Sequence, residues 1–120
     1  MTQAVLLVDH GSRRPEANEQ LEALAERLRT RMPDRLVLTA HLDVLQPDVG
    51  AGLDACAEAG TREVVVHPYF LGPGRHTAED IPRLVAEAAG RHPNMSVRIS
   101  EPLGLHDRIL DVVVERIERA

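Results

Sequence analysis

The chain alternates short, continuous apolar runs with longer segments in which apolar residues recur every three or four positions. The runs lie at residues 4–9, 35–42, 61–68 and 95–100, and the periodic segments at 15–32, 47–60, 78–90 and 105–120. The first pattern is typical of strands covered on both faces, and the second of helices with one buried side. Their alternation predicts a single α/β domain, residues 1–120, with a four-stranded parallel sheet and helices on both faces. Because crossover connections are right-handed, the flavodoxin-like, doubly wound strand order 2-1-3-4 is favoured.

The helical segments carry apolar positions on one side. Those expected to face inward are Leu21, Leu24, Ala25, Leu28 and Met32 in 15–32, and Ile81, Leu84, Val85 and Ala88 in 78–90; the apolar side of 105–120 carries Ile109, Val113 and Ile117. Thr77 and Asp80 are both candidate caps for the third helix, and Pro82, which suits a first turn, favours Asp80.

Composition narrows the class of protein. The formal net charge of −5 argues against nucleic acid as the partner, although a local arginine cluster can still bind a polyanion. The single cysteine, Cys56, excludes an internal disulfide framework and is expected to be a buried core residue. No apolar run has the roughly 20 residues of a membrane span, and no basic segment precedes the apolar N-terminus as in a signal peptide. We therefore expect a cytoplasmic protein with no membrane partner.

Two polar loops follow the first and third predicted strands. In the order 2-1-3-4 these strands are neighbours, and ligands bind in such sheets at the carboxyl ends where the strand order reverses. The first loop, "DHGSRRP", carries His10, Arg13 and Arg14; the second, "HPYFLGPGRH", carries Arg75 and His76. Histidine suits a divalent metal or a base near neutral pH, and arginine suits carboxylates or phosphates. Structural roles remain an equal alternative for His10, His76, Arg13 and Arg14.

The motifs resemble a known family. The segments "VDHGSRRPEAN", "AHLDVLQPDV", "HPYFLGPGRHTAEDIP" and "EPLGLHDRILDVVVERI" together are similar to the small, half-length class II chelatases that insert cobalt or iron into sirohydrochlorin. The third and fourth segments look especially like the plant-type sirohydrochlorin ferrochelatases. Those enzymes carry a cysteine-bearing tail for an iron–sulfur cluster. Because this chain has a single cysteine, we expect no cluster, and we also expect no organic cofactor.

The resemblance implies roles for particular residues. His10 and His76 fall on the metal-binding histidines, and His10 also on the proton acceptor. Asp43 falls on an acidic residue that is usually Glu, and is a weaker candidate base. The substrate contacts fall on Leu71, Gly72, Pro73, Gly74, Arg75, His76 and Gln46, the last at a position that is usually Glu; we add Arg13 and Arg14 as candidate partners for substrate carboxylates.

These residues imply a chelatase, a lyase that inserts Co²⁺ or Fe²⁺ into sirohydrochlorin during siroheme or cobalamin synthesis. Nickel insertion into the same kind of ring is one alternative, because imidazole and carboxylate ligands suit Co, Fe and Ni alike. A metal or tetrapyrrole carrier without turnover is another. Since the half-length family pairs two chains around the large ring, a symmetric homodimer is also expected.

Overall fold

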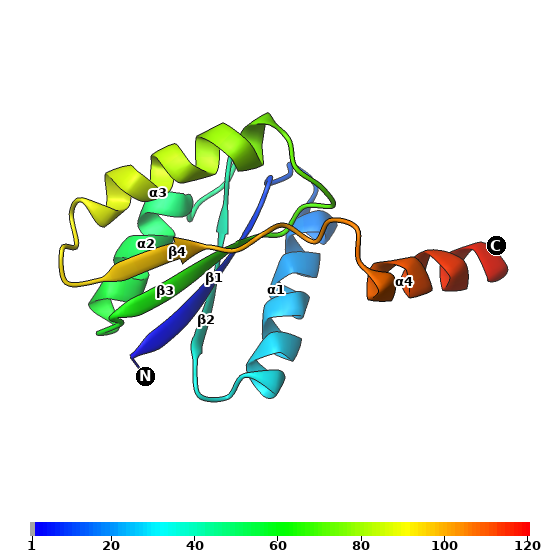
Figure 1. Cartoon of the computed structure of the whole chain (residues 1–120), viewed down its shortest axis with the longest axis horizontal. Coiled ribbons are helices and arrows are strands. Elements are labelled where there is room, and N and C mark those ends of the chain that lie inside the picture. The colour runs from blue at the N-terminus through cyan, green and yellow to red at the C-terminus, as the bar shows by residue number, and fades with distance from the viewer. Residues whose placement is uncertain (1) are drawn as a thin grey trace.

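The computed structural model describes residues 2–120, except for the side chains of His76 and Thr77. Its sheet has the order β2-β1-β3-β4, and every neighbouring pair is parallel (Figure 1). The strands are β1 (Gln3–Asp9), β2 (Leu36–His41), β3 (Glu63–Pro68) and β4 (Ser96–Ile99). The predicted strand order and direction are therefore confirmed.

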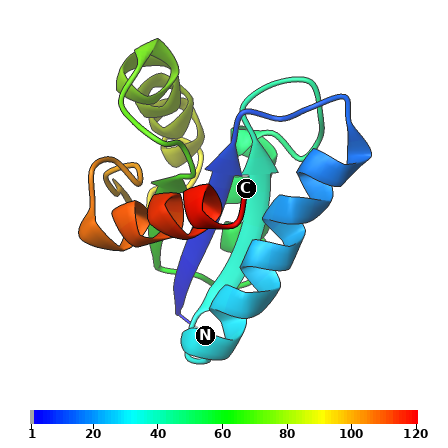
Figure 2. The same ribbon diagram turned by 90° about the vertical axis from the view of Figure 1, so that its right-hand side faces the viewer.

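Helices cover both faces of this sheet, and the last helix projects away from it. They are α1 (Pro15–Arg31), α2 (Val49–Glu58), α3 (Ile81–Ala89) and α4 (Asp107–Glu118), with a π-helical turn, η1 (His76–Asp80), leading into α3. Helices α2 and α3 cover one face and α1 the other (Figures 1 and 2). The predicted two-sided cover is thus present in this domain.

Side chains of β1 alternate between two apolar clusters because successive strand residues point to opposite faces. Leu6 and Val8 belong to the cluster that α2 and α3 cover, whereas Val5 and Leu7 pack with α1. The inward positions predicted on α1 and α3 are all buried or partly buried in these clusters. Helix periodicity was therefore sufficient to identify their packed sides.

The start of α3 differs from the prediction. Asp80 precedes α3, but its backbone is already helical and its side chain makes no capping hydrogen bond. The reason is that helical structure begins earlier, in η1, so the amides of the first turn of α3 continue an existing helix. The Asp80 carboxylate instead lies 3.9 Å from the Arg83 guanidinium.

Helix α4 is formed as predicted but does not pack on the sheet. It projects from the end of β4 away from the other elements (Figure 1), and no residue within it is buried. Of the apolar side predicted for this helix, Val113 and Ile117 are exposed and Ile109 is partly buried. None of the helices in the described residues is long and apolar enough to cross a membrane.

Candidate functional site

The carboxyl ends of β1, β2 and β3 bring three loops together. The amide of Leu42 donates to the Asp9 carbonyl at 2.8 Å, and that of Asp43 to the His10 carbonyl at 3.0 Å. On the other side of β1, the Tyr69 amide donates to the Val8 carbonyl at 2.7 Å. A cavity of about 280 Å³ opens here; it is lined by Asp9, His10, Gly11, Ser12, Ala17, Gln20, Leu21, Tyr69 and Phe70. The crevice predicted between the first and third strands therefore exists, with the exposed His10 on its wall.

Gly11 is required where the loop after β1 crosses the loop after β2. Its φ of +92° lies in the left-handed region, and a Cβ there would stand 2.0 Å from the Asp43 carbonyl oxygen. Any side chain would force these loops apart, since real Cβ atoms essentially never approach an atom below 3.0 Å. The glycine after His10 is thus what allows Asp43 to lie beside His10.

Asn18 holds the loop that carries Arg13 and Arg14. Its side-chain amide donates to the Ser12 carbonyl at 2.7 Å, and its Oδ1 accepts from the Ser12 amide at 3.2 Å. Both arginines are exposed on this braced loop. Their exposure leaves the guanidinium groups available to an anionic ligand, which is compatible with the predicted substrate contacts but does not test them.

A largely buried hydrogen bond between a histidine and a carboxylate lies behind the cavity. Asp9 and His41 are register partners on β1 and β2, and the Nδ1 atom of His41 lies 2.6 Å from Oδ1 of Asp9. The His41 side chain is 7 % exposed and that of Asp9 18 %. Because Asp9 lines the cavity while His41 is behind it, the imidazole restrains a carboxylate that faces the candidate site.

Asp43 is positioned by a tight turn. The Asp43 carbonyl accepts from the Leu45 amide at 2.8 Å across Val44, whose φ is 74°, and its Oδ1 accepts from the Val44 amide at 2.8 Å. These contacts define a γ-turn with a β-branched residue in a conformation that such residues rarely adopt. The Asp43 carboxylate is exposed and close in the fold to His10, but it does not line the cavity.

Gln46 lies outside the cavity that His10 lines. It lines a different cavity, of about 480 Å³, together with residues of α2, α3 and the loop after α3. Its side chain accepts from the Asp48 amide at 3.1 Å and so supports the start of α2. The described structure therefore does not bring Gln46 into the cavity that contains His10.

The segment Leu71–His76 follows β3 and leads into η1. Leu71 is 77 % exposed, Arg75 is exposed, and the Gly74 carbonyl accepts from the Ala78 amide at 2.8 Å. The backbone places His76 at the start of η1, but its side chain lies outside the described part, so the predicted pairing of His10 with His76 is untested. Within the described side chains, no group of three or more His, Cys, Asp or Glu residues could hold a metal ion.

Sequence reasoning missed two supporting features, the Asp9–His41 pair and the Asn18 brace. Both depend on contacts between elements that are not adjacent in the chain or on loop conformation. The only available signal was indirect: Asp9 and His41 end the first two predicted strands, which the order 2-1-3-4 makes neighbours.

Comparison with known proteins identifies the family. The CbiX family model matches residues 4–120. The chain belongs to the CbiX family. Among curated relatives, the chloroplastic sirohydrochlorin ferrochelatase of Arabidopsis thaliana is 40 % identical over 114 residues, which are 95 % of this chain and 51 % of the relative. The sirohydrochlorin cobaltochelatase of Methanocaldococcus jannaschii is 28 % identical, and the match covers 95 % of this chain and 96 % of that protein.

Solved structures of CbiX-related proteins agree on the fold. The sirohydrochlorin chelatase SirB from Bacillus subtilis subspecies spizizenii, in complex with cobalt, superposes with a TM-score of 0.92 at 29 % identity. That match covers 99 % of this chain and 51 % of SirB. The putative cobalamin biosynthesis CbiX protein from Marinobacter aquaeolei VT8 gives a TM-score of 0.79 at 28 % identity, with 98 % and 99 % of the two chains covered. The chain thus spans about half the length of the first curated relatives, but nearly all of the shorter family members.

Proposed function

We propose that this chain is a sirohydrochlorin chelatase that inserts Co²⁺ or Fe²⁺ into the ring, for siroheme or cobalamin synthesis. The observation that carries the proposal is the cavity at the carboxyl ends of β1 and β3, with His10 and Asp9 on its wall. The relatives named sirohydrochlorin ferrochelatase and cobaltochelatase support the choice of substrate and of metals. A cytoplasmic location remains the expectation from the sequence.

Metal insertion needs a weakly held divalent ion and a base for the two pyrrole N–H protons. In this proposal His10 and His76 hold the incoming metal, since two imidazoles leave coordination positions open to the ring nitrogens. His10, once free of metal, accepts a proton, and Asp43 beside it is the weaker candidate base. Each proton transfer by a positioned base contributes a factor of about 10²–10⁴ in rate.

The ring must also be held in place. Sirohydrochlorin carries eight carboxylate side groups, as the family resemblance implies, and the exposed guanidinium groups of Arg13, Arg14 and Arg75 are suited to bind them. Tyr69 and Phe70, with Ala17 and Leu21, supply the apolar part of the cavity wall. A cavity of about 280 Å³ is too small to enclose such a macrocycle, so we propose that a second copy of the chain completes the site in a homodimer.

The test is anaerobic metal insertion followed by absorbance, with sirohydrochlorin and each of Co²⁺, Fe²⁺ and Ni²⁺, against a protein-free control. We expect acceleration with Co²⁺ or Fe²⁺ and a loss of about 100-fold or more in His10→Ala. His92→Ala is the matched control, because His92 lies in the loop before β4, at the opposite end of the sheet.

Each outcome of this assay has a clear meaning. Acceleration with Ni²⁺ alone would favour the nickel reaction instead. Stoichiometric binding of ring or metal without acceleration would favour a carrier. An unchanged rate in His10→Ala would show that the cavity is not the site of metal insertion.

A further inference from the structure

Asp9 is held at the cavity wall by both its backbone and its side chain. Its carbonyl accepts from the Leu42 amide at 2.8 Å, and its Oδ1 lies 2.6 Å from Nδ1 of His41. Because an ionised carboxylate only accepts hydrogen bonds, Nδ1 of His41 is the donor. His41 is itself fixed, since its side chain is 7 % exposed and its amide donates to the Pro47 carbonyl at 2.9 Å. The fold therefore sets the direction of the Asp9 carboxylate.

This carboxylate gives the cavity a negative wall. Among the described residues that line the cavity, Asp9 is the one acidic side chain and none is an arginine. Within the same part of the chain, the ion pairs of the arginines do not include Asp9. A carboxylate that is only 18 % exposed is stabilised by a cation approaching from its open side, because buried charges are paired or bind metals in proteins. The cavity therefore favours a cation.

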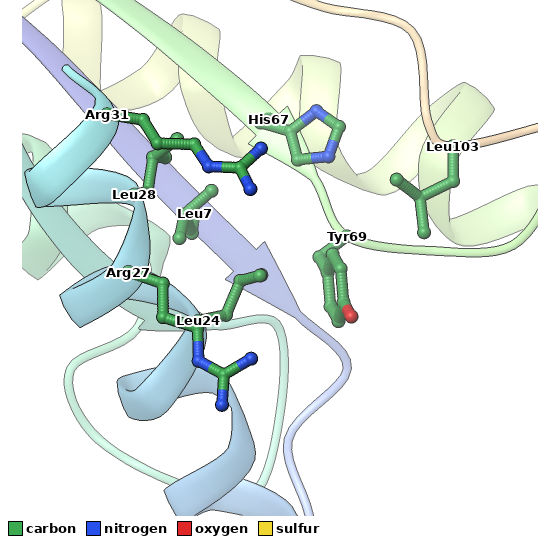
Figure 3. A pocket seen from close by; sticks show the side chains of 8 residues that line it. All are labelled: Leu7, Leu24, Arg27, Leu28, Arg31, His67, Tyr69 and Leu103. Carbon is green, nitrogen blue, oxygen red and sulfur yellow. The ribbon is translucent and has the colours of Figure 1, made fainter. Parts of the chain in front are cut away.

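The neighbouring cavity on the same face of the sheet has the opposite charge. Its volume is about 390 Å³, and it shares Tyr69 with the cavity that Asp9 lines. Figure 3 shows the guanidinium groups of Arg27 and Arg31 among its lining side chains, and no described residue that lines it is acidic. The two cavities therefore favour ligands of opposite charge, and a metal ion is expected only in the one that contains Asp9.

The residue after Asp9 supplies a second donor for the same ion. Asp9 ends β1, His10 follows it directly, and both line the one cavity. Imidazole nitrogen combined with carboxylate oxygen is a donor set that binds Fe²⁺ in open sites, and few protein ligands leave positions for the ring nitrogens. Asp43 is placed differently, because it does not line the cavity and its Oδ1 accepts from the amide of its own turn. Asp9 is therefore the carboxylate better placed to meet the ion.

We propose that Asp9 is a ligand of the incoming metal ion beside His10, and that His41 is a positioning residue that holds the Asp9 carboxylate toward the ion. One oxygen of Asp9 accepts from His41, which leaves the other oxygen for the metal. A hydrogen bond to a ligating carboxylate is common around protein metal sites, because it fixes the direction of the ligand. The inference rests on the proposed function for the identity of the ion, and it adds an oxygen donor to the two histidines.

Titration of the chain with Co²⁺, without any tetrapyrrole, tests the ligand. The visible absorption of Co²⁺ depends on its ligands and so reports binding without turnover. We expect the wild-type chain to bind Co²⁺, and Asp9→Asn to bind it at least about tenfold more weakly with a changed spectrum. Asparagine keeps an oxygen that accepts from His41, so this variant should fold, which circular dichroism checks. Equal affinities of Asp9→Asn and wild type, or no binding by the wild type, would overturn the proposal.

Asp54→Asn is the matched control for this titration. It removes the same charge from another histidine–carboxylate contact, in which Oδ1 of Asp54 lies 2.6 Å from Nε2 of His92. Asp54 does not line the cavity that contains Asp9. We therefore expect wild-type Co²⁺ affinity in Asp54→Asn. An equal loss of affinity in Asp54→Asn and Asp9→Asn would show an effect of net charge and would contradict ligation by Asp9.

Two substitutions of His41 test the positioning role. His41→Leu removes the donor to Asp9, whereas His41→Asn keeps an N–H donor near the position of Nδ1. We expect the Co²⁺ affinity to fall about 10–100-fold in His41→Leu and to recover largely in His41→Asn. Wild-type affinity and spectrum in folded His41→Leu would contradict the positioning role. Because this titration needs no tetrapyrrole, Co²⁺ binding through Asp9 without metal insertion would contradict the proposed function alone, and insertion with unchanged Co²⁺ affinity in Asp9→Asn would contradict this inference alone.

Discussion

The Nδ1 atom of His41 lies 2.6 Å from Oδ1 of Asp9, where the two residues end neighbouring strands beside the candidate site. This contact is the most buried of the His–carboxylate pairs in the described residues: the two side chains are 7 % and 18 % exposed, against 24 % and 40 % for His92 and Asp54. It connects the stability of the sheet to the orientation of a carboxylate on the cavity wall.

His41→Ala should destabilise the fold, because it removes the imidazole hydrogen bond from a carboxylate that is only 18 % exposed. The expected loss is about 1–3 kcal/mol in the free energy of unfolding, measured by urea denaturation. His92→Ala is the control: its Asp54 partner is more exposed and keeps a hydrogen bond from Arg91, so the loss should be below about 1 kcal/mol. Equal losses in the two variants would contradict the importance of burial.

Gly11→Ala should strongly impair both folding and metal insertion. The added Cβ would stand 2.0 Å from the Asp43 carbonyl oxygen, and the left-handed backbone alone costs about 1–2 kcal/mol for a residue with a side chain. Gly72→Ala, where a Cβ would have no atom within 4 Å, should change the free energy of unfolding by less than about 0.5 kcal/mol. Thermal unfolding of both variants checks this contrast, which fails if Gly11→Ala unfolds like the wild-type chain.

Val44→Gly should stabilise the loop conformation around Asp43. A φ of 74° costs a valine of the order of 1–3 kcal/mol, which glycine avoids, although the greater flexibility of the unfolded glycine chain offsets part of the gain. We expect a net gain of about 1 kcal/mol in the free energy of unfolding. A decrease in stability would show that the Val44 side chain, half exposed in this structure, makes contacts that outweigh the strain.

Burial lowers the pKa of His67 below its ordinary value of 6.5. Between that lowered pKa and 6.5, the unfolded chain binds a proton that the folded chain does not. The contribution of the neutral His67 to the stability of the fold is therefore fully present above pH 6.5. It is lost as the pH falls from 6.5 through the lowered pKa. An NMR titration of the His67 ring should show the lowered pKa, and His67→Gln should reduce the pH dependence of stability there. A pKa at or above 6.5 would contradict this expectation.

Burial raises the pKa of the Cys56 thiol to about 11, and its side chain is enclosed in the core. The thiol should therefore not react with a disulfide reagent at about pH 8 in the folded chain, since the thiolate is the nucleophile. Reaction should become complete in denaturing urea. Because the folded pKa lies above the ordinary one, stability is retained below about pH 9 and declines as the pH rises toward 11. Rapid labelling of the folded chain would contradict the burial.

Much of the fold was predictable because hydrophobic periodicity specifies which side of each element is buried. Continuous apolar runs identified the four strands, and right-handed crossovers left the order that the structure has. The same rules located the cavity, since they make β1 and β3 neighbours with their carboxyl ends at one edge. The cap at Asp80 was wrong because η1 extends the helix backwards, which local residue preferences did not indicate.

The amino-acid sequence alone determined the order and the direction of the strands and the sides of α1 and α3 that are buried. Only the tertiary structure decided that Asp9 contacts His41, that Gly11 lies against the Asp43 carbonyl, that Gln46 lines a separate cavity and that α4 stands away from the sheet. The physical reason is that periodicity reports whether a side chain avoids water, whereas contacts between distant segments depend on how the elements pack. The apolar side of α4 could thus be identified from the sequence, but the position of this helix away from the sheet is decided by packing in three dimensions.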